Sequence, residues 1–237
     1  DAPAIREADI GIAMGQIGTD VAKEAAAMVL SDDNYATIVA AIEEGRSIYE
    51  NIRKFIRYLL GCNIGEILTM LLAAATNLPL PLIAVQILLM NLVTDGLPAI
   101  ALSLDPVNPC IMNRPPRRVD AGIFSGGLLK TITVQGTLIA LGTVGVFLYT
   151  LVSGSPLIEA RTMAFSTLVI SQLFYVFRCR GLDSQGFFAD LVSNPYLTGA
   201  VILSFGAHIT VLTHPALQKI FQVSTLSGSD WRIVLMV

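Results

Sequence analysis

Charged side chains are scarce in this sequence. Asp, Glu, Lys and Arg together make up 14% of the 237 residues, against about 25% in ordinary soluble domains. Hydrophobic residues make up 54%. This composition excludes an ordinary soluble protein and predicts that most of the chain lies in a lipid bilayer. The formal net charge is only −3, so the charge balance does not indicate a nucleic-acid partner.

Cysteine is also rare. Cys62, Cys110 and Cys179 are widely spaced and form no CxxC pair, so we do not expect a disulfide framework. The chain opens with Asp1 rather than Met, shows no signal-peptide pattern, and stops within the apolar run WRIVLMV. We therefore expect a fragment of a longer protein.

Proline is absent between residues 34 and 77, which permits one long helix. Its first part, 34–57, is amphipathic and reads as a cytoplasmic stalk. Its second part, 58–76, is apolar. A helix of about 40 residues would extend about 60 Å, enough to cross a bilayer and reach well into water. Such a helix could transmit force from a soluble domain into the membrane.

Residues 1–33 have the character of a soluble α/β domain. Short apolar runs at 10–14 and 27–31 predict two buried strands. Between them, Thr19 or Asp20 could cap a short helix. The GxxGTD string after the first strand fits a tight turn better than a phosphate-binding loop.

Further hydrophobic segments predict several membrane spans. With the span at 58–76, we expect them at 82–104, 127–152, 160–178 and 196–213, with a truncated span at 230–237. The connections at 105–130 and 178–195 are basic, which places them on the cytoplasmic side together with the N-terminal segment. The predicted fold is therefore a mainly α-helical, polytopic membrane protein.

The span at 82–104 carries an aspartate near its centre. A charge at that depth costs about 2.5–3.5 kcal/mol on insertion scales, and it usually marks an ion or proton path. Asn91, Thr94 and Asp95 follow helical i, i+3, i+4 spacing, which predicts one shared face. Oxygen ligands of this kind suit a hard cation. Gly96 and Pro98 follow directly and weaken a continuous helix, so freed carbonyls could join the site.

A second intramembrane acid, Glu66, lies in the span at 58–76, with Asn63 three residues earlier on the same face. No Lys or Arg lies at that depth, so the two acids must be protonated, hydrogen-bonded or neutralised by a cation. The alternative is a polar cluster that only joins helices. Gln172 could add a neutral oxygen ligand or a helix-to-helix hydrogen bond. His208 fits a packed, hydrogen-bonded residue better than a ligand.

Five motifs in order resemble the C-terminal part of P-type cation-transporting ATPases of the calcium-pump branch. They are DAPAIREADIGIAMGQIGTDVAKEAAAMVL, NIRKFIRYLL, NIGE, NLVTDGLPAIAL and DPVNPCIMNRPPRR. The resemblance covers essentially the whole chain. It implies that residues 1–33 end a haloacid-dehalogenase-like phosphorylation domain and that 58–237 form the C-terminal transmembrane bundle, beginning with the family's fifth membrane helix.

The resemblance also implies residue roles. Asp1 is similar to the last aspartate of the GDGxND motif, which lies beside magnesium and the phosphoryl group. The implied cation ligands are Asn63, Glu66, Asn91, Thr94, Asp95 and Gln172. Two-site calcium pumps have glutamate at the position of Gln172, so one calcium ion per cycle is expected. The sodium/potassium branch has an acid at the position of Asn91, which argues against that branch.

The implied activity is ATP-driven export of Ca²⁺ from the cytoplasm, across the plasma membrane, through an aspartyl-phosphate intermediate. ATP and Mg²⁺ would be bound by upstream domains, because this chain has no DKTGT, TGE or PEGLP-type motif. The carboxylates would bind Ca²⁺ from the cytoplasm and take up protons after releasing it on the other side. Alternatives are a pump for Mn²⁺, Na⁺ or K⁺, a channel or secondary transporter, and a non-catalytic membrane scaffold.

Overall fold

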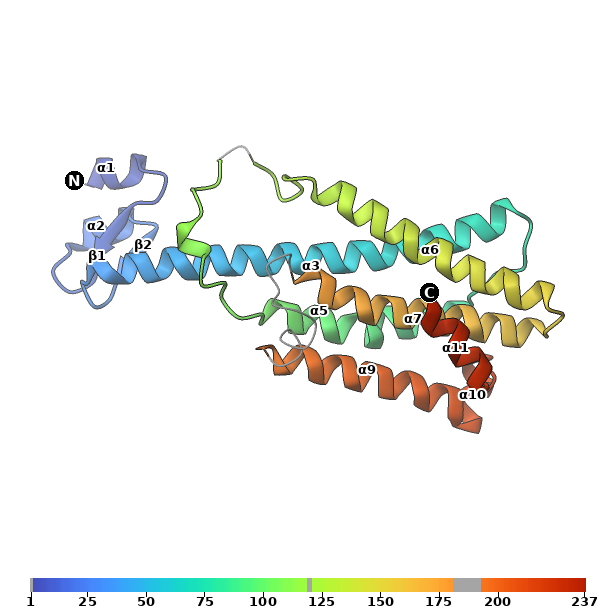
Figure 1. Cartoon of the computed structure of the whole chain (residues 1–237). Helices are drawn as coiled ribbons and strands as arrows, with labels where there is room; N and C mark the ends of the chain where they lie inside the picture. The colour runs from blue at the N-terminus through green and yellow to red at the C-terminus, as the bar shows by residue number, and fades with distance from the viewer. Residues whose placement is uncertain (1, 119–120, 181–192) are drawn as a thin grey trace. The chain divides into compact units, whose positions relative to one another are not determined.

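The computed structural model describes residues 2–118, 121–180 and 193–237 (Figure 1). The chain forms two compact units. The first comprises residues 1–49 and 107–115, and the second comprises 50–106 and 116–237. Both contain part of the long helix α3, Tyr35–Ala75, which runs for 41 residues and continues through both Gly45 and Gly61.

The first unit is a small α/β arrangement. Its remaining elements are α1 (Ala2–Glu7), β1 (Ile12–Met14), α2 (Asp20–Ala25), β2 (Met28–Leu30) and the 3-10 turn η2 (Ile111–Asn113). The two strands pair in parallel, with Ala13 opposite Val29. The Thr19 hydroxyl caps α2 by accepting a hydrogen bond from the Ala22 amide at 3.3 Å.

The loop after β1 is held by a carboxylate of the protein itself. Asp33 accepts hydrogen bonds from the backbone amides of Gln16 and Ile17, both at 2.9 Å. These amides are the groups that a phosphate would need. The GxxGTD string therefore forms an internally satisfied turn.

The second unit is a helical bundle. Besides the later part of α3, it contains α4 (Ala84–Leu89), the π-helical turn η1 (Met90–Thr94), α5 (Gly96–Ser103), α6 (Leu128–Val152), α7 (Leu157–Cys179), α9 (Pro195–Thr213), α10 (Pro215–Phe221) and α11 (Gly228–Met236). Five stretches are long and apolar enough to span a membrane: Tyr35–Ala75, Ala84–Ser103, Leu128–Val152, Leu157–Cys179 and Pro195–Thr213. The prediction of a mainly helical, polytopic membrane fold is thus confirmed.

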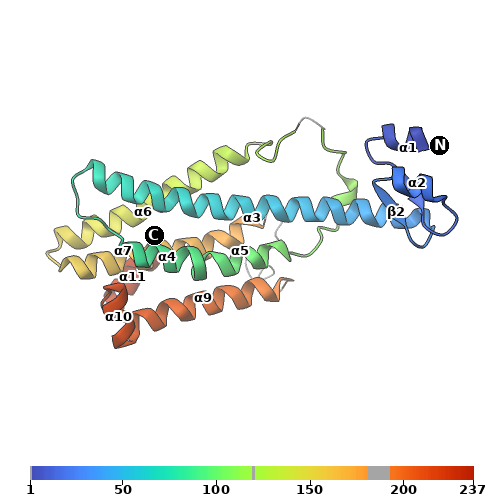
Figure 2. The ribbon, with the colours of Figure 1, turned by 180° about the vertical axis from the view of Figure 1, so that it is seen from behind.

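Helix α7 lies at the centre of this bundle. In its most apolar stretch 83% of the residues are buried, against 28% to 44% in the other four spanning helices. Figures 1 and 2 both show α5 and α7 running between α3 and α9. The outer helices therefore have faces left for lipid, whereas protein covers most of α7 and leaves side chains such as Phe174 exposed.

Close approach of α6 to α3 depends on a glycine. A Cβ atom at Gly136 would lie 2.5 Å from Cγ2 and 2.8 Å from Cβ of Ile64. Both distances are too short for a carbon atom, so only glycine lets the two helices pack at this separation.

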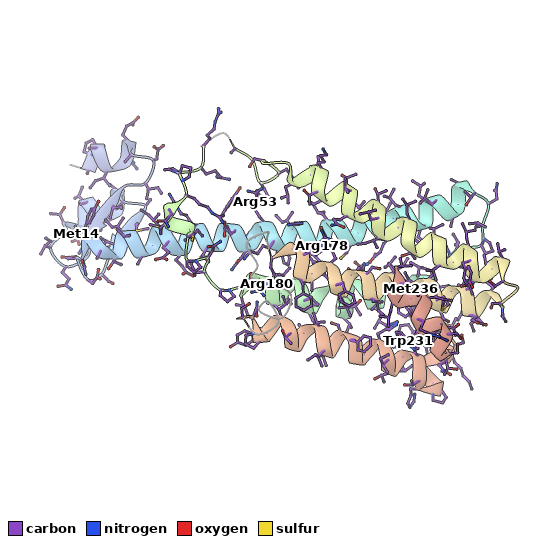
Figure 3. All side chains as sticks on the ribbon, in the orientation of Figure 1. Met14, Arg53, Arg178, Arg180, Trp231 and Met236 are labelled. Carbon is purple, nitrogen blue, oxygen red and sulfur yellow. The ribbon has the colours of Figure 1, made fainter. Side chains whose placement is uncertain are left out.

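The C-terminal segment packs against the bundle through aromatic and amide contacts. Trp231 of α11, labelled in Figure 3, meets Phe205 of α9 edge to face, with ring centroids 6.4 Å apart. The sequence pattern did not predict α10. Its last residue, Phe221, accepts a hydrogen bond through its carbonyl from the buried side chain of Gln86 at 2.9 Å.

Candidate functional site

The broken helix α4–η1–α5 positions one of the two buried acids. In the π turn the amide of Asp95 donates to the Met90 carbonyl, five residues back, at 2.8 Å. Pro98 has no N–H, so the Thr94 carbonyl receives no helical hydrogen bond from it. The Val93 carbonyl accepts instead from the Ser204 hydroxyl of α9 at 3.1 Å. The predicted weakening of the helix is therefore present, and it begins before Gly96.

Glu66 of α3 is buried, with 5% of its surface exposed, and two amides hold its carboxylate. Gln172 Nε2 donates to Oε1 at 3.0 Å, and Asn91 Nδ2 donates to Oε2 at 3.3 Å. Three segments distant in sequence thus converge on one carboxylate. Asn91 itself remains exposed on its outer side.

Asp95 is fully buried, and its environment differs from that of Glu66. The Tyr58 hydroxyl donates to Oδ1 at 3.2 Å. Its other oxygen, Oδ2, has no hydrogen-bond donor among the described residues, and the same is true of the fully buried Oε1 of Gln172. No Lys or Arg in the described part of the chain forms an ion pair with either acid.

Two other predicted ligands are turned toward their own helices. Asn63 Nδ2 donates to the Leu59 carbonyl at 2.8 Å. The hydroxyl of Thr94 donates to the Met90 carbonyl at 3.0 Å, which leaves its oxygen lone pairs able to accept or to ligate. Asp1 lies outside the described residues.

Tyr58 is a site residue that the sequence interpretation missed. Tyr58, Cys62 and Glu66 follow i, i+4, i+8 spacing, so extending the face of Glu66 by two turns could have found it. Tyr58 also packs against Tyr175 of α7, with ring centroids 6.0 Å apart. His208, in contrast, packs against Phe165 and pairs with the Ser166 hydroxyl at 3.1 Å, in agreement with its interpretation as a packed residue.

The arrangement can offer oxygen atoms to a cation. The atoms that could ligate a cation are oxygens of carboxylates, amides and a hydroxyl, and hard cations prefer such oxygen ligands. Among the described residues there is no cluster of three or more His, Cys, Asp or Glu side chains that could hold a metal ion, so neutral amides and hydroxyls would have to complete the coordination. The unpartnered oxygens of Asp95 and Gln172 fit this chemistry, because a buried oxygen without a donor is costly unless something compensates it.

Fold and site together define an integral, multi-pass membrane protein with two acids buried between its spanning helices. Comparison with known proteins identifies the family. The family model described as "Cation transporting ATPase, C-terminus" matches residues 79–237. This chain belongs to that family of cation-transporting ATPases.

Named relatives match across the whole chain. It is 49% identical over 236 residues to the calcium-transporting ATPase of Bacillus subtilis (strain 168), covering 99% of this chain and 26% of that protein. Identity is 39% over 253 residues with calcium-transporting ATPase 1 of Bacillus cereus (strain ATCC 10987 / NRS 248), covering 100% and 28%. Identity is 37% over 292 residues with the endoplasmic reticulum-type calcium-transporting ATPase 4 of Arabidopsis thaliana, covering 100% of this chain and 28% of that protein. The chain therefore spans only about a quarter of the length of these relatives.

Proposed function

We propose that this chain is the cation-binding membrane part of an ATP-driven calcium pump. The observation that carries the proposal is the convergence of Asn91 and Gln172 on Glu66, with the buried Asp95 close enough to Glu66 for their charges to interact. Neither acid has a basic partner among the described residues. The names of the relatives, all calcium-transporting ATPases, support Ca²⁺ as the transported ion.

The geometry suggests how a cation would replace the amide hydrogen bonds to Glu66. In the structure both oxygens of Glu66 accept from amide nitrogens. Rotation of the Gln172 and Asn91 amides would turn oxygen instead of nitrogen toward an arriving cation. Asp95 Oδ2 and Gln172 Oε1 would then become ligands together with Glu66. Asn63 and Thr94 would contribute after rotating away from their own helices.

A neutral residue at 172 supports one Ca²⁺ per cycle. Two carboxylates neutralise one divalent ion, and a second ion would have no further acid to compensate it among the ligands proposed here. On the release side, Glu66 and Asp95 would take up protons in exchange, because an uncompensated pair of buried carboxylates is strongly unfavourable. Proton counter-transport is thus part of the proposal.

ATP hydrolysis would be supplied by upstream domains of the same pump. They would bind ATP and Mg²⁺ and form the aspartyl phosphate, with Asp1 beside the magnesium and phosphoryl group. Helix α3 would transmit their movement, since one uninterrupted helix carries residues of both units. The N-terminal segment would face the cytoplasm and the pump would act in the plasma membrane.

The test is the Asp95→Asn substitution in the full-length protein. We expect loss of calcium-dependent phosphorylation by ATP, because one of the two acids that compensate the ion is removed, while calcium-independent phosphorylation by inorganic phosphate persists. Asp230→Asn is the matched control, because Asp230 is a half-buried carboxylate of the α11 capping box and accepts a hydrogen bond from the Ser227 amide. Unchanged calcium dependence in Asp95→Asn would show that Asp95 is not a ligand.

A panel of cations completes the experiment. ATPase activity of the wild-type protein should be stimulated by Ca²⁺ and much less by Mn²⁺, Na⁺ or K⁺. Cation flux in vesicles without ATP would instead support a channel or secondary transporter. A wild-type protein with no cation-stimulated ATPase activity would contradict the pump proposal as a whole.

A further inference from the structure

A second buried carboxylate, that of Asp105, lies two residues beyond the end of α5 and is surrounded by cationic and amide side chains. Its Oδ2 accepts from Lys54 Nζ of α3 at 2.6 Å. Its Oδ1 accepts from Arg180 Nε, just beyond α7, at 2.8 Å and from Asn194 Nδ2, the N-cap of α9, at 3.0 Å. Figure 3 labels Arg180 at this position. One side chain thus joins four elements of the bundle.

The backbone around Asp105 is tied into the same cluster. Asn51 of α3 donates from Nδ2 to the carbonyl of Asp105 at 2.8 Å. Asn194 Nδ2 also reaches the Ala101 carbonyl at 3.2 Å, while its oxygen accepts from the Leu197 amide of α9 at 3.0 Å. The end of α5 is therefore fixed by side chains of α3 and of the α9 cap. We call Asn51, Lys54, Asp105, Arg180 and Asn194 the Asp105 clamp.

The clamp is deeply buried for a group of charges. The side chain of Asp105 is 4% exposed, that of Arg180 8% and that of Lys54 15%. Burial alone would raise the pKa of Asp105, but the hydrogen bonds from Lys54 and Arg180 hold it below its ordinary value. Buried ion pairs are poor sources of net stability compared with apolar packing, and their best-attested role is to specify one register.

The elements that the clamp joins are those that carry the candidate ligands. Lys54 lies twelve residues before Glu66 on α3, Asp105 ten residues after Asp95, and Arg180 eight residues after Gln172. At 1.5 Å per helical residue, Arg180 and Gln172 are separated by about 12 Å along α7. A shift of one helix along its axis would therefore change the clamp and the candidate site together.

We propose that Asp105 is a positioning residue for the cation site, whose clamp fixes the axial register of α3, α5 and α7 and passes displacements of α3 to the residues around Asp95. This inference rests on the proposed function, because it assumes that Glu66, Asp95 and Gln172 bind the ion. Asp105 itself is not a ligand in this proposal.

The experiment measures calcium-dependent phosphorylation of the full-length pump carrying Asp105→Asn. We expect the half-saturating Ca²⁺ concentration to rise by roughly 2- to 30-fold, the range of coupling changes produced by residues that touch neither ligand. The phosphoenzyme level at saturating Ca²⁺ should stay near that of the wild type. A second variant, Arg180→Met, removes one of the two cations paired with Asp105. Its matched control is Arg178→Met, because Arg178 lies two residues away and is exposed.

Additional variants separate positioning from a loss of folding. Asp105→Asn leaves two buried cations, and combining it with Lys54→Met restores the net charge. The double variant should regain thermal stability but keep the raised half-saturating concentration, because no ion pair joins α3 to α5. Lys54→Arg should behave like the wild type. If Asp105→Asn does not accumulate, Lys54→Met and Arg180→Met give the same test, since each leaves Asp105 one cation.

The outcomes distinguish the two proposals. Calcium-dependent phosphorylation in the wild type with an unchanged half-saturating concentration in the clamp variants would refute the role of Asp105 only. A half-saturating concentration that follows thermal stability across all variants would also refute it. Absence of calcium-dependent phosphorylation in the wild type would instead refute the proposed function.

Discussion

Replacing Gln172 by methionine would decide whether this buried amide binds the cation or only joins two helices. Methionine has a similar length and removes both polar atoms. The change deletes the 3.0 Å hydrogen bond from Nε2 to Glu66. It also deletes Oε1, which has no donor among the described residues although the side chain is fully buried.

The size of the effect follows from the charged acceptor. A hydrogen bond to an ionised group contributes about 1.5–3 kcal/mol, so the variant should lose stability of that order in either case. If the oxygen of Gln172 also ligates Ca²⁺, a loss of similar size in binding corresponds to a roughly 10- to 150-fold rise in the half-saturating Ca²⁺ concentration. If the amide only joins helices, that concentration should not change.

The assay pairs thermal unfolding of the solubilised full-length protein with calcium-dependent phosphorylation. Thr167→Val is the matched control, because Thr167 is equally buried on α7 but its hydroxyl donates to Met163 within the same helix. Gln172→Glu keeps an oxygen at this position and should retain calcium binding. A Gln172→Met protein that is destabilised yet binds Ca²⁺ normally would refute the assignment of Gln172 as a ligand.

Three further predictions concern packing, ion pairs and the N-terminal loop. Gly136→Leu should separate α6 from α3, because even a Cβ atom would lie 2.5 Å from Ile64. Size-exclusion chromatography should show loss of folded protein. The control Gly145→Ala should be tolerated, because a Cβ atom at Gly145 would meet no atom of another helix within 4 Å. The pKa of Asp105 is lowered in the folded protein. The ionised carboxylate should therefore stabilise the fold fully above its ordinary pKa of about 3.9, and this stabilisation should be lost as the pH falls through the lower folded value. Thermal unfolding between pH 8 and pH 3 would measure the loss, and an identical acid-induced loss in Asp105→Asn would contradict the prediction. Asp33→Ala should speed hydrogen exchange of the two loop amides that Asp33 accepts from, and unchanged exchange would show that this carboxylate does not hold the loop.

Much of the fold could be predicted because its signals are local. The lack of proline before residue 77 and the run of apolar residues that follows 57 are sufficient to indicate a long helix entering a membrane. The paired strands likewise follow from short apolar runs bounded by turn residues. Gln86, buried and bonded to Phe221, and helix α10 were not predicted, because their roles depend on contacts between residues more than a hundred positions apart.

The candidate site could be predicted only in part. The acids were evident, since a carboxylate within an apolar span is conspicuous in any sequence. Helical spacing placed Asn91 and Asp95 on one face, but the π turn changes that geometry: Asn91 contacts Glu66, whereas Asp95 contacts Tyr58. The Asp105 clamp was missed because its members come from four separate elements, and no local pattern links Lys54 to Arg180.

The π turn at Met90–Thr94 has a consequence for how this segment can vary in length. Its extra residue is what distinguishes this turn from an α-helical turn. Deleting one residue inside the π turn would return it to α-helical hydrogen bonding with little rotation of α4. Deleting one residue of α4 after Gln86 would instead turn everything before it by about 100°, and Gln86 would leave its partner on α10. Relatives should therefore vary in length inside the π turn far more readily than in α4.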